Sequence, residues 1–253
     1  MSTILELQSV SKSYGALKVT NNVSLSIEQA QCHVIIGPNG AGKTSLIHQI
    51  GGQLRSDSGR ILLRGDNIAG SDPEDICRKG IARTFQKNNL FNELPVLENV
   101  RLAVQARHFN SWNMLRQVRN LSGLRERAEE ILLMVHLTGS SRRLAKDLSY
   151  GEQRQLEIAL ALASDPDVLL LDEPTSGMSP AETGKMSALV ASLPSSLTIV
   201  MIEHDMDVVF SLADTVTVLA RGSVLATGTP AEIRANEVVH EVYLGKDAIH
   251  APA

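Results

Sequence analysis

The stretch VIIGPNGAGKTSLI, residues Val34–Ile47, constrains the fold of this chain more than any other part of its sequence. It contains the pattern G-x-x-x-x-G-K-[ST] between an apolar run at Cys32–Ile36 and a segment of helical character at Ser45–Leu54. Glycines let successive backbone N–H groups turn inward around an anion, and a helix that begins near Gly42 directs its positive end to the same place. The pattern therefore predicts a strand, a phosphate-binding loop and a helix, in preference to a glycine-rich turn with a solvated lysine.

The residues of this loop have distinct predicted roles. Lys43 is expected to reach the β and γ phosphates of a nucleotide, and the Thr44 hydroxyl is expected to hold Mg²⁺. The other predicted contacts to the nucleotide are Gly37, Asn39, Gly40, Ala41, Gly42 and Ser45. Phosphate groups together with Mg²⁺ are therefore the expected ligands of the loop.

A second segment, DVLLLDEPTSG at Asp167–Gly177, would complete such a site. An apolar run that ends in two acids is typical of a buried parallel strand that presents carboxylates at its C-terminal edge. Asp172 would ligate Mg²⁺ directly or through water, and Glu173 would act as general base or position the attacking water. Taken alone, the two acids could equally cap the turn at Pro174, but beside a phosphate loop the functional interpretation is favoured.

Composition limits the class of protein. A chain of 253 residues with 43% hydrophobic content can form one large domain or a domain with an inserted lobe. We expect a cytosolic chain, because no apolar run approaches the roughly 18 residues of a membrane span and the N-terminus lacks a secretion signal. Cys32 and Cys77 are expected to be buried reduced thiols. The net charge of −4 predicts no general attraction to nucleic acid.

Further motifs follow the phosphate loop in a fixed order. Gln86 ends the segment RTFQ, LSYGEQ occupies Leu148–Gln153 one helix ahead of the acid strand, and His204 follows the apolar run IVMI. In these five ordered motifs the sequence resembles the ATP-binding cassette (ABC) ATPases over nearly the whole chain. The resemblance implies an α/β fold, with a P-loop NTPase (RecA-like) core, an antiparallel β subdomain and an inserted helical lobe.

The same resemblance implies one cassette domain over residues 1–253. The nucleotide-binding core with its β subdomain would comprise residues 1–86 and 164–235, the helical lobe with the LSYGEQ signature residues 87–163, and a C-terminal tail residues 236–253. Short apolar alternations before Gly37 and near Ile61 independently indicate an antiparallel sheet. An amphipathic helix is indicated within the lobe by apolar residues at helical spacing, namely Leu124, Ala128, Ile131, Leu132 and Val135.

The family's mechanism places ATP between two cassettes that face each other head to tail. Carried onto this chain, Ser149 and Gly151 would contact the γ-phosphate of ATP bound in the partner cassette, which is an identical copy or a paralogue. Tyr14 matches the position that stacks on adenine, although a packed surface tyrosine remains the alternative. His204 would hydrogen-bond the γ-phosphate and orient water with Glu173.

Gln86 would sense Mg²⁺ and water, so the resemblance implies a metal site of Thr44, Gln86 and Asp172. In the family, the surface around this glutamine and the helical lobe receives helices from membrane permease subunits. The chain would then lie on the cytoplasmic face of the cell membrane, with an extracytoplasmic solute-binding protein as an indirect partner and no nucleic acid.

Within the family, the sequence is most similar to the cassettes of branched-chain and related hydrophobic amino-acid importers, and urea or short amides remain possible cargo. This resemblance rests on RTFQKNNLFNELPVLENV, on Tyr150 in the signature and on the ending NEVVHEVYLGKD. Cassettes of lipopolysaccharide export share the VYLG tail and stay as an alternative. Two other hypotheses are a soluble ATP-driven switch, which would need a basic face or an extra domain, and a cassette that binds ATP without hydrolysing it.

Three positions depart from the family pattern. Glu152 replaces the usual glutamine of the signature, Leu160 replaces an arginine, and Ser179 replaces the aspartate or asparagine that helps to link the two ATP sites. Because Lys43 and Glu173 are intact, we expect slower or less tightly coupled hydrolysis, not its loss.

Overall fold

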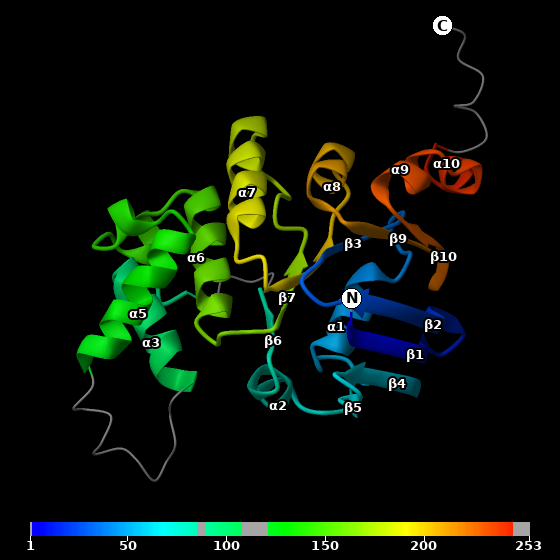
Figure 1. Cartoon of the computed structure of the whole chain (residues 1–253), viewed down its shortest axis with the longest axis horizontal. Helices are drawn as coiled ribbons and strands as arrows, with labels where there is room; N and C mark the ends of the chain where they lie inside the picture. The colour runs from blue at the N-terminus through cyan, green and yellow to red at the C-terminus, as the bar shows by residue number, and fades with distance from the viewer. Residues whose placement is uncertain (1, 85–89, 108–120, 245–253) are drawn as a thin grey trace, which may run out of the picture. The chain divides into compact units, whose positions relative to one another are not determined.

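The computed structural model describes residues 2–84, 90–107 and 121–244, and the chain divides into two compact units (Figure 1). Unit 1 consists of Met1–Ile76, Leu170–Glu173 and Ser195–Ala253, and unit 2 of Cys77–Leu169 and Pro174–Pro194. The phosphate loop and the two acids therefore belong to unit 1, whereas the LSYGEQ signature belongs to unit 2.

An antiparallel sheet forms the first part of unit 1. Its strand order is β2-β1-β4-β5, with bounds β1 Thr3–Tyr14, β2 Leu17–Glu28, β4 Ser58–Leu63 and β5 Asp66–Asn67. In β2 the buried side chains of Val23, Leu25 and Ile27 alternate with exposed polar residues at positions 22, 24 and 26, as in a sheet with one covered face. The antiparallel sheet predicted from the alternating pattern is confirmed.

A second, mainly parallel sheet carries the phosphate loop. Its order in unit 1 is β10-β9-β3-β8, followed by the last three residues of β7. The bounds are β3 Cys32–Ile36, β7 Val168–Asp172, β8 Thr198–Ile202, β9 Thr215–Ala220 and β10 Ser223–Gly228. β3 pairs in parallel with both β8 and β9, and every residue of β7 and β8 is buried. The uninterrupted apolar runs in β7 and β8 are explained by their burial on both faces of the sheet.

Helices of unit 1 cover this parallel sheet. Figure 1 shows α8 and α9 on one side of β3, β9 and β10, and α1 on the other side. The bounds are α1 Lys43–Ile50, α2 Pro73–Arg78, α8 Met206–Leu212, α9 Pro230–Arg234 and α10 Glu237–Leu244; α2 crosses from unit 1 into unit 2 at Ile76. The predicted strand Cys32–Ile36 is confirmed. The predicted helix to Leu54 is too long, because Gly51 and Gly52 follow Ile50 and Gly52 adopts a left-handed φ of 78°.

Unit 2 is mainly helical. Its elements are β6 Ile81–Arg83, α3 Val96–Arg107, α5 Leu121–Met134, the short 3₁₀ turns Thr138–Ser140 and Ala145–Asp147, α6 Tyr150–Leu162 and α7 Pro180–Ser192. The apolar residues predicted to form one face of a helix are all buried, although Val135 lies just beyond the end of α5. α3 packs against α5 and α6, so these buried side chains form the core of this unit.

Both cysteines are free thiols, as predicted, but each is only half-buried, so the expectation of full burial is wrong. For Cys32, at the start of β3, partial burial and the nearby Asp214 carboxylate raise the pKa to about 12, which keeps the thiol protonated. Across the described residues, no helix has the length and apolar character that crossing a bilayer requires.

Candidate functional site

The phosphate loop joins β3 to α1 in unit 1. A Cβ on Gly37 would lie 2.2 Å from the Leu219 carbonyl oxygen, and a Cβ on Gly42 would lie 2.1 Å from that of Val19. Gly42 also has a φ of +99°, which side chains rarely tolerate. Backbone from β9 and β2 therefore approaches the loop so closely that only glycine fits at these two positions.

The lysine of the motif points back into the loop. Lys43 is 8% exposed, and its ammonium donates to the Gly37 carbonyl at 2.7 Å and to the Pro38 carbonyl at 3.2 Å. Burial lowers the pKa of Lys43, and the negative charges of Glu173 and Asp172 act in the opposite direction. Two backbone carbonyls thus hold the Lys43 ammonium inside the loop, and the negative charges of Asp172 and Glu173 stabilise its positive charge.

The helix after the loop starts without a side-chain cap. Gly42 is the N-cap of α1 and offers no side-chain acceptor. The first N–H groups of such a helix need an acceptor from elsewhere, and together with the helix dipole they favour an anion. Asn39 and Gly40 are exposed, Ala41 is buried, and Thr44 and Ser45 are half-buried at this helix start.

Oxygen donors suited to Mg²⁺ flank the loop. Thr44 lies in the first turn of α1, and Asp172, which is 5% exposed, is the last residue of β7. A hydroxyl and a carboxylate are hard ligands of the kind Mg²⁺ binds, usually with phosphate and water oxygens completing the shell. The described part of the chain contains no group of three or more His, Cys, Asp or Glu residues that could hold a metal ion. The third predicted ligand, Gln86, lies outside the described residues.

Glu173 has an unusual backbone conformation. It directly follows β7, has a φ of +48°, and its N–H donates to the Ile202 carbonyl at 3.0 Å. A non-glycine residue in the left-handed region costs on the order of 1 kcal/mol and persists only where its surroundings fix it. The bond to Ile202, the last residue of β8, therefore fixes the backbone of Glu173, and strain of this kind is often found at functional sites.

His204 follows β8, and its side chain is 59% exposed. Its backbone N–H donates at 3.0 Å to the Glu203 carboxylate, which is fully buried, and its Nδ1 lies 3.9 Å from the same oxygen. Asp205 then caps α8 by accepting from the N–H groups of Asp207 and Val208. The sequence alone did not single out Glu203 or Asp205. The helix cap formed by Asp205 could have been predicted from the local sequence, whereas the bond between the buried Glu203 and the His204 backbone could not.

Tyr14 ends β1 and is 56% exposed. The Lys12 ammonium lies 5.6 Å from its ring centroid and is itself held by Asp57 at 2.7 Å. An exposed ring with a nearby cation presents a surface on which a flat ligand could stack.

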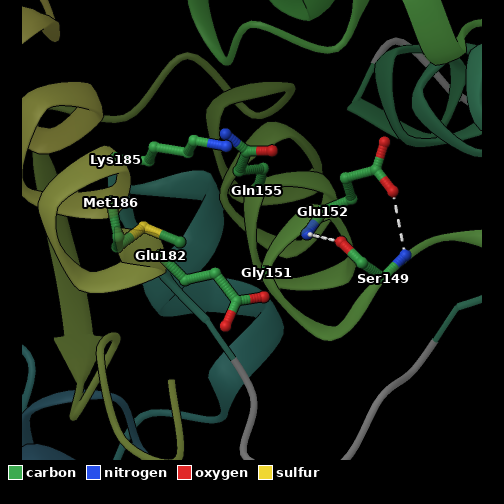
Figure 2. A pocket seen from close by; sticks show the side chains of 7 residues that line it. All are labelled: Ser149, Gly151, Glu152, Gln155, Glu182, Lys185 and Met186. Carbon is green, nitrogen blue, oxygen red and sulfur yellow. Dashed lines mark hydrogen bonds between the residues drawn. The ribbon is translucent and has the colours of Figure 1, made fainter. Parts of the chain in front are cut away.

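The signature lies at the start of α6 in unit 2. Ser149 is the N-cap of this helix and forms a capping box with Glu152 (Figure 2). Burial raises the pKa of Glu152, but hydrogen bonds from Ser149 and Ser140 and the charge of Arg143 outweigh it and hold the pKa below its usual value. Glu152 therefore stays ionised and ties the signature to the turn before it.

A pocket of about 230 Å³ lies beside this helix start (Figure 2). It is lined by residues of α6 and α7, together with the cap of α6: Ser149, Gly151, Glu152, Gln155, Glu182, Lys185 and Met186. Ser149 and Gly151 both line this pocket at the start of α6.

A phosphate loop, two acids after an apolar strand whose charges act on the loop lysine, and a signature whose serine caps a helix together define a nucleotide-binding cassette. The family model described as "ABC transporter" matches residues 20–176, and the chain belongs to this family of ATP-binding, ATP-hydrolysing cassettes. A second model, described as "Branched-chain amino acid ATP-binding cassette transporter", matches residues 223–249.

Several curated proteins are similar over almost the whole chain. The high-affinity branched-chain amino acid transport ATP-binding protein BraF of Pseudomonas aeruginosa is 40% identical over 252 residues, which cover 96% of this chain and 98% of that protein. LivG of Salmonella typhimurium, with the corresponding description, is 37% identical with the same coverage. The lipopolysaccharide export system ATP-binding protein LptB of Haemophilus influenzae is 31% identical, again covering 96% and 98%.

Solved structures confirm the predicted fold class. The ADP conformation of MJ1267, an ATP-binding cassette of an ABC transporter, has a TM-score of 0.85 and 31% identity, covering 97% of this chain and all of that one. MJ0796, a cassette solved as a dimer bound to ADP and phosphate, has a TM-score of 0.75 and 25% identity, covering 90% and 99%. CbiO1 from Clostridium perfringens, part of the complex cbiONQ, has a TM-score of 0.81 and 26% identity, covering 98% of each chain.

Proposed function

We propose that this chain is the ATP-hydrolysing subunit of a membrane importer for branched-chain or related amino acids. One observation carries the ATPase part: the Lys43 ammonium points into a phosphate loop while the charges of Asp172 and Glu173 act on it. The cargo is supported by the descriptions of BraF and LivG and by the match at residues 223–249.

The residues of unit 1 would divide the work on ATP. Lys43 would exchange the carbonyls of Gly37 and Pro38 for β and γ phosphate oxygens, while the N–H groups at the start of α1 bind the same phosphates. Thr44 and Asp172 would hold Mg²⁺, which neutralises phosphate charge when bound. The exposed ring of Tyr14 would stack on adenine.

The hydrolytic step would depend on Glu173 and His204. Glu173 would accept a proton from the attacking water or fix its direction, and His204 would donate a hydrogen bond to the γ-phosphate. Gln86 keeps its proposed role of sensing Mg²⁺ and water.

A second cassette would complete each ATP site. Ser149 and Gly151 would contact the γ-phosphate of ATP bound by the partner, whether that partner is an identical chain or a paralogue. The dimer of MJ0796 with ADP and phosphate supports the pairing of two cassettes. The whole chain would act as one cassette domain, with residues 1–86 and 164–235 as core, 87–163 as helical lobe and 236–253 as tail.

Membrane permease subunits would dock on the helical lobe and hold the chain at the cytoplasmic face, and an external solute-binding protein would deliver the cargo. CbiO1, as part of cbiONQ, is a precedent for a cassette within a larger complex. The similarity to LptB keeps a lipid or lipopolysaccharide exporter as a second candidate.

Trapping the closed dimer distinguishes these candidates. A tagged Glu173→Gln chain is expressed in its native cells, and the membranes are isolated. The chain is then purified with ATP, and the copurifying proteins are identified. The tagged parent chain with ADP is the matched control. Multi-span permeases with an external amino-acid receptor would support the importer. Periplasmic and outer-membrane components that carry lipid would support the exporter, and soluble partners or nucleic acid alone would overturn the transporter assignment.

A further inference from the structure

Tyr150 links the signature to another segment of unit 2. Its hydroxyl donates to the Ser176 carbonyl at 3.2 Å. Its ring lies against Gly177, where an added Cβ would be 3.7 Å from Cε1, and Gly177 has a left-handed φ of +78°. A tyrosine in the signature thus touches the loop that leaves the acid strand.

The phenol is itself held in place. Arg154 Nη2 donates to the Tyr150 oxygen at 2.9 Å, and its guanidinium lies 5.2 Å from the ring centroid. The same arginine pairs at 2.8 Å with Glu157, which is 6% exposed. Tyr150 is 42% exposed, so these bonds to Arg154, and not burial, hold the ring in its orientation.

Glu182 makes a second link between the same two segments. One carboxylate oxygen, Oε2, accepts from the Ser179 N–H at 3.0 Å and from the Ser179 hydroxyl at 2.7 Å. The other oxygen, Oε1, would lie 3.4 Å from a Cβ built on Gly151. Figure 2 shows the Glu182 carboxylate directed toward Gly151 across the pocket edge. Glu182 therefore lies beside Gly151 of the signature while it completes the capping box of α7.

We propose that Tyr150 and Glu182 are positioning residues that couple the signature, Ser149–Gly151, to the segment Ser176–Ser179. This segment begins three residues after Glu173 in the chain. If a bound phosphate displaces the signature, the two contacts would therefore also displace the backbone that follows Glu173. The inference rests on the proposed ATPase function and assigns Tyr150 a mechanical role. We call this pair of contacts the signature joint.

The first test removes one hydroxyl. Tyr150→Phe keeps the ring on Gly177 and loses the bond to Ser176 together with the bonds from Arg154 to the phenol oxygen. Of these only the bond to Ser176 joins the two segments, so kcat for ATP hydrolysis falls about three- to tenfold, roughly the effect of one hydrogen bond, with KM within about twofold. Ser187→Ala is the matched control, because it removes a hydroxyl that donates to the Thr183 carbonyl at 2.9 Å on α7, away from the joint. Its kcat and KM stay at the parent values.

The second test separates coupling from helix capping. Glu182→Ala is compared with Glu232→Ala, which removes the equivalent capping box between Thr229 and Glu232 at the start of α9. Both variants lower the melting temperature by a similar amount, but only Glu182→Ala lowers kcat. In the double variant Tyr150→Phe/Glu182→Ala, kcat falls by less than the product of the two single fold-losses, because both substitutions disrupt the same signature joint.

Three results would overturn the coupling: unchanged kcat in Tyr150→Phe, equal changes of kcat in Glu182→Ala and Glu232→Ala, or single losses that simply multiply. A parent chain whose hydrolysis does not differ from that of Glu173→Gln would instead overturn the proposed ATPase function, and the coupling with it. The two failures are therefore distinguishable in one set of assays.

Discussion

Acidification is expected to destabilise this chain through His33, which lies in β3 directly ahead of the phosphate loop. The imidazole is 1% exposed, and its Nε2 lies 2.8 Å from the Thr217 hydroxyl. Nδ1 has no hydrogen-bond partner among the described residues. Burial lowers the pKa of His33 from 6.5 to about 4, so the folded chain keeps this side chain neutral where an unfolded chain would protonate it.

The sign and size of the effect follow from proton linkage. Between pH 6.5 and about pH 4 the unfolded state binds the extra proton, so stability is complete above this window and is lost as the pH falls through it. At about 1.4 kcal/mol per pKa unit, the total loss at pH 4 and below is roughly 3 kcal/mol. By about pH 5, some 2 kcal/mol of this should already be gone.

Urea unfolding followed by circular dichroism at about pH 7.5 and about pH 5 measures this loss. We expect the free energy of unfolding of the parent to fall by about 2 kcal/mol more than that of His33→Gln, which cannot be protonated. The control is His136→Asn, because His136 is exposed and has a left-handed φ of 59° that asparagine tolerates. It should keep the pH dependence of the parent. Equal pH dependence in the parent and His33→Gln would refute the reasoning.

Three further outcomes are expected. Gly42→Ala should destabilise the chain by roughly 2 kcal/mol or more and weaken ATP binding in calorimetry, because its Cβ would overlap the Val19 carbonyl; normal affinity would contradict the tight fit. Asp205→Ala should cost about 1 kcal/mol in thermal unfolding through the lost α8 cap, and an unchanged melting temperature would argue against it. If the departures from the family pattern slow hydrolysis, Leu160→Arg and Ser179→Asn should raise turnover, and turnover equal to the parent's would remove that hypothesis.

The strand, loop and helix around Lys43 could be predicted from sequence because their determinants are local. Glycine conformation, an apolar strand and a helix start lie within a short stretch of chain, and the structure places β3 and the start of α1 as expected. The predicted helix end at Leu54 is wrong, because the apolar pattern continues to Leu54 while Gly51 and Gly52 end the helix at Ile50.

The contacts of the signature joint could not be predicted in the same way. Tyr150 and Ser176 are 26 positions apart, and their bond depends on how α6 packs against α7. Only the capping box of Ser179 and Glu182 has a local pattern, and that pattern does not reveal that the second carboxylate oxygen faces Gly151. Long-range packing of this kind is a property of the fold and not of any single motif.

Phosphate release from ATP with Mg²⁺, compared between the parent and Glu173→Gln, tests the central claim most directly. If Glu173 acts on the attacking water, the substitution should lower turnover by about 10²- to 10⁴-fold while ATP still binds. Turnover in the parent that Glu173→Gln leaves unchanged would contradict the assignment of Glu173, and with it the account of this chain as an ATP-hydrolysing cassette.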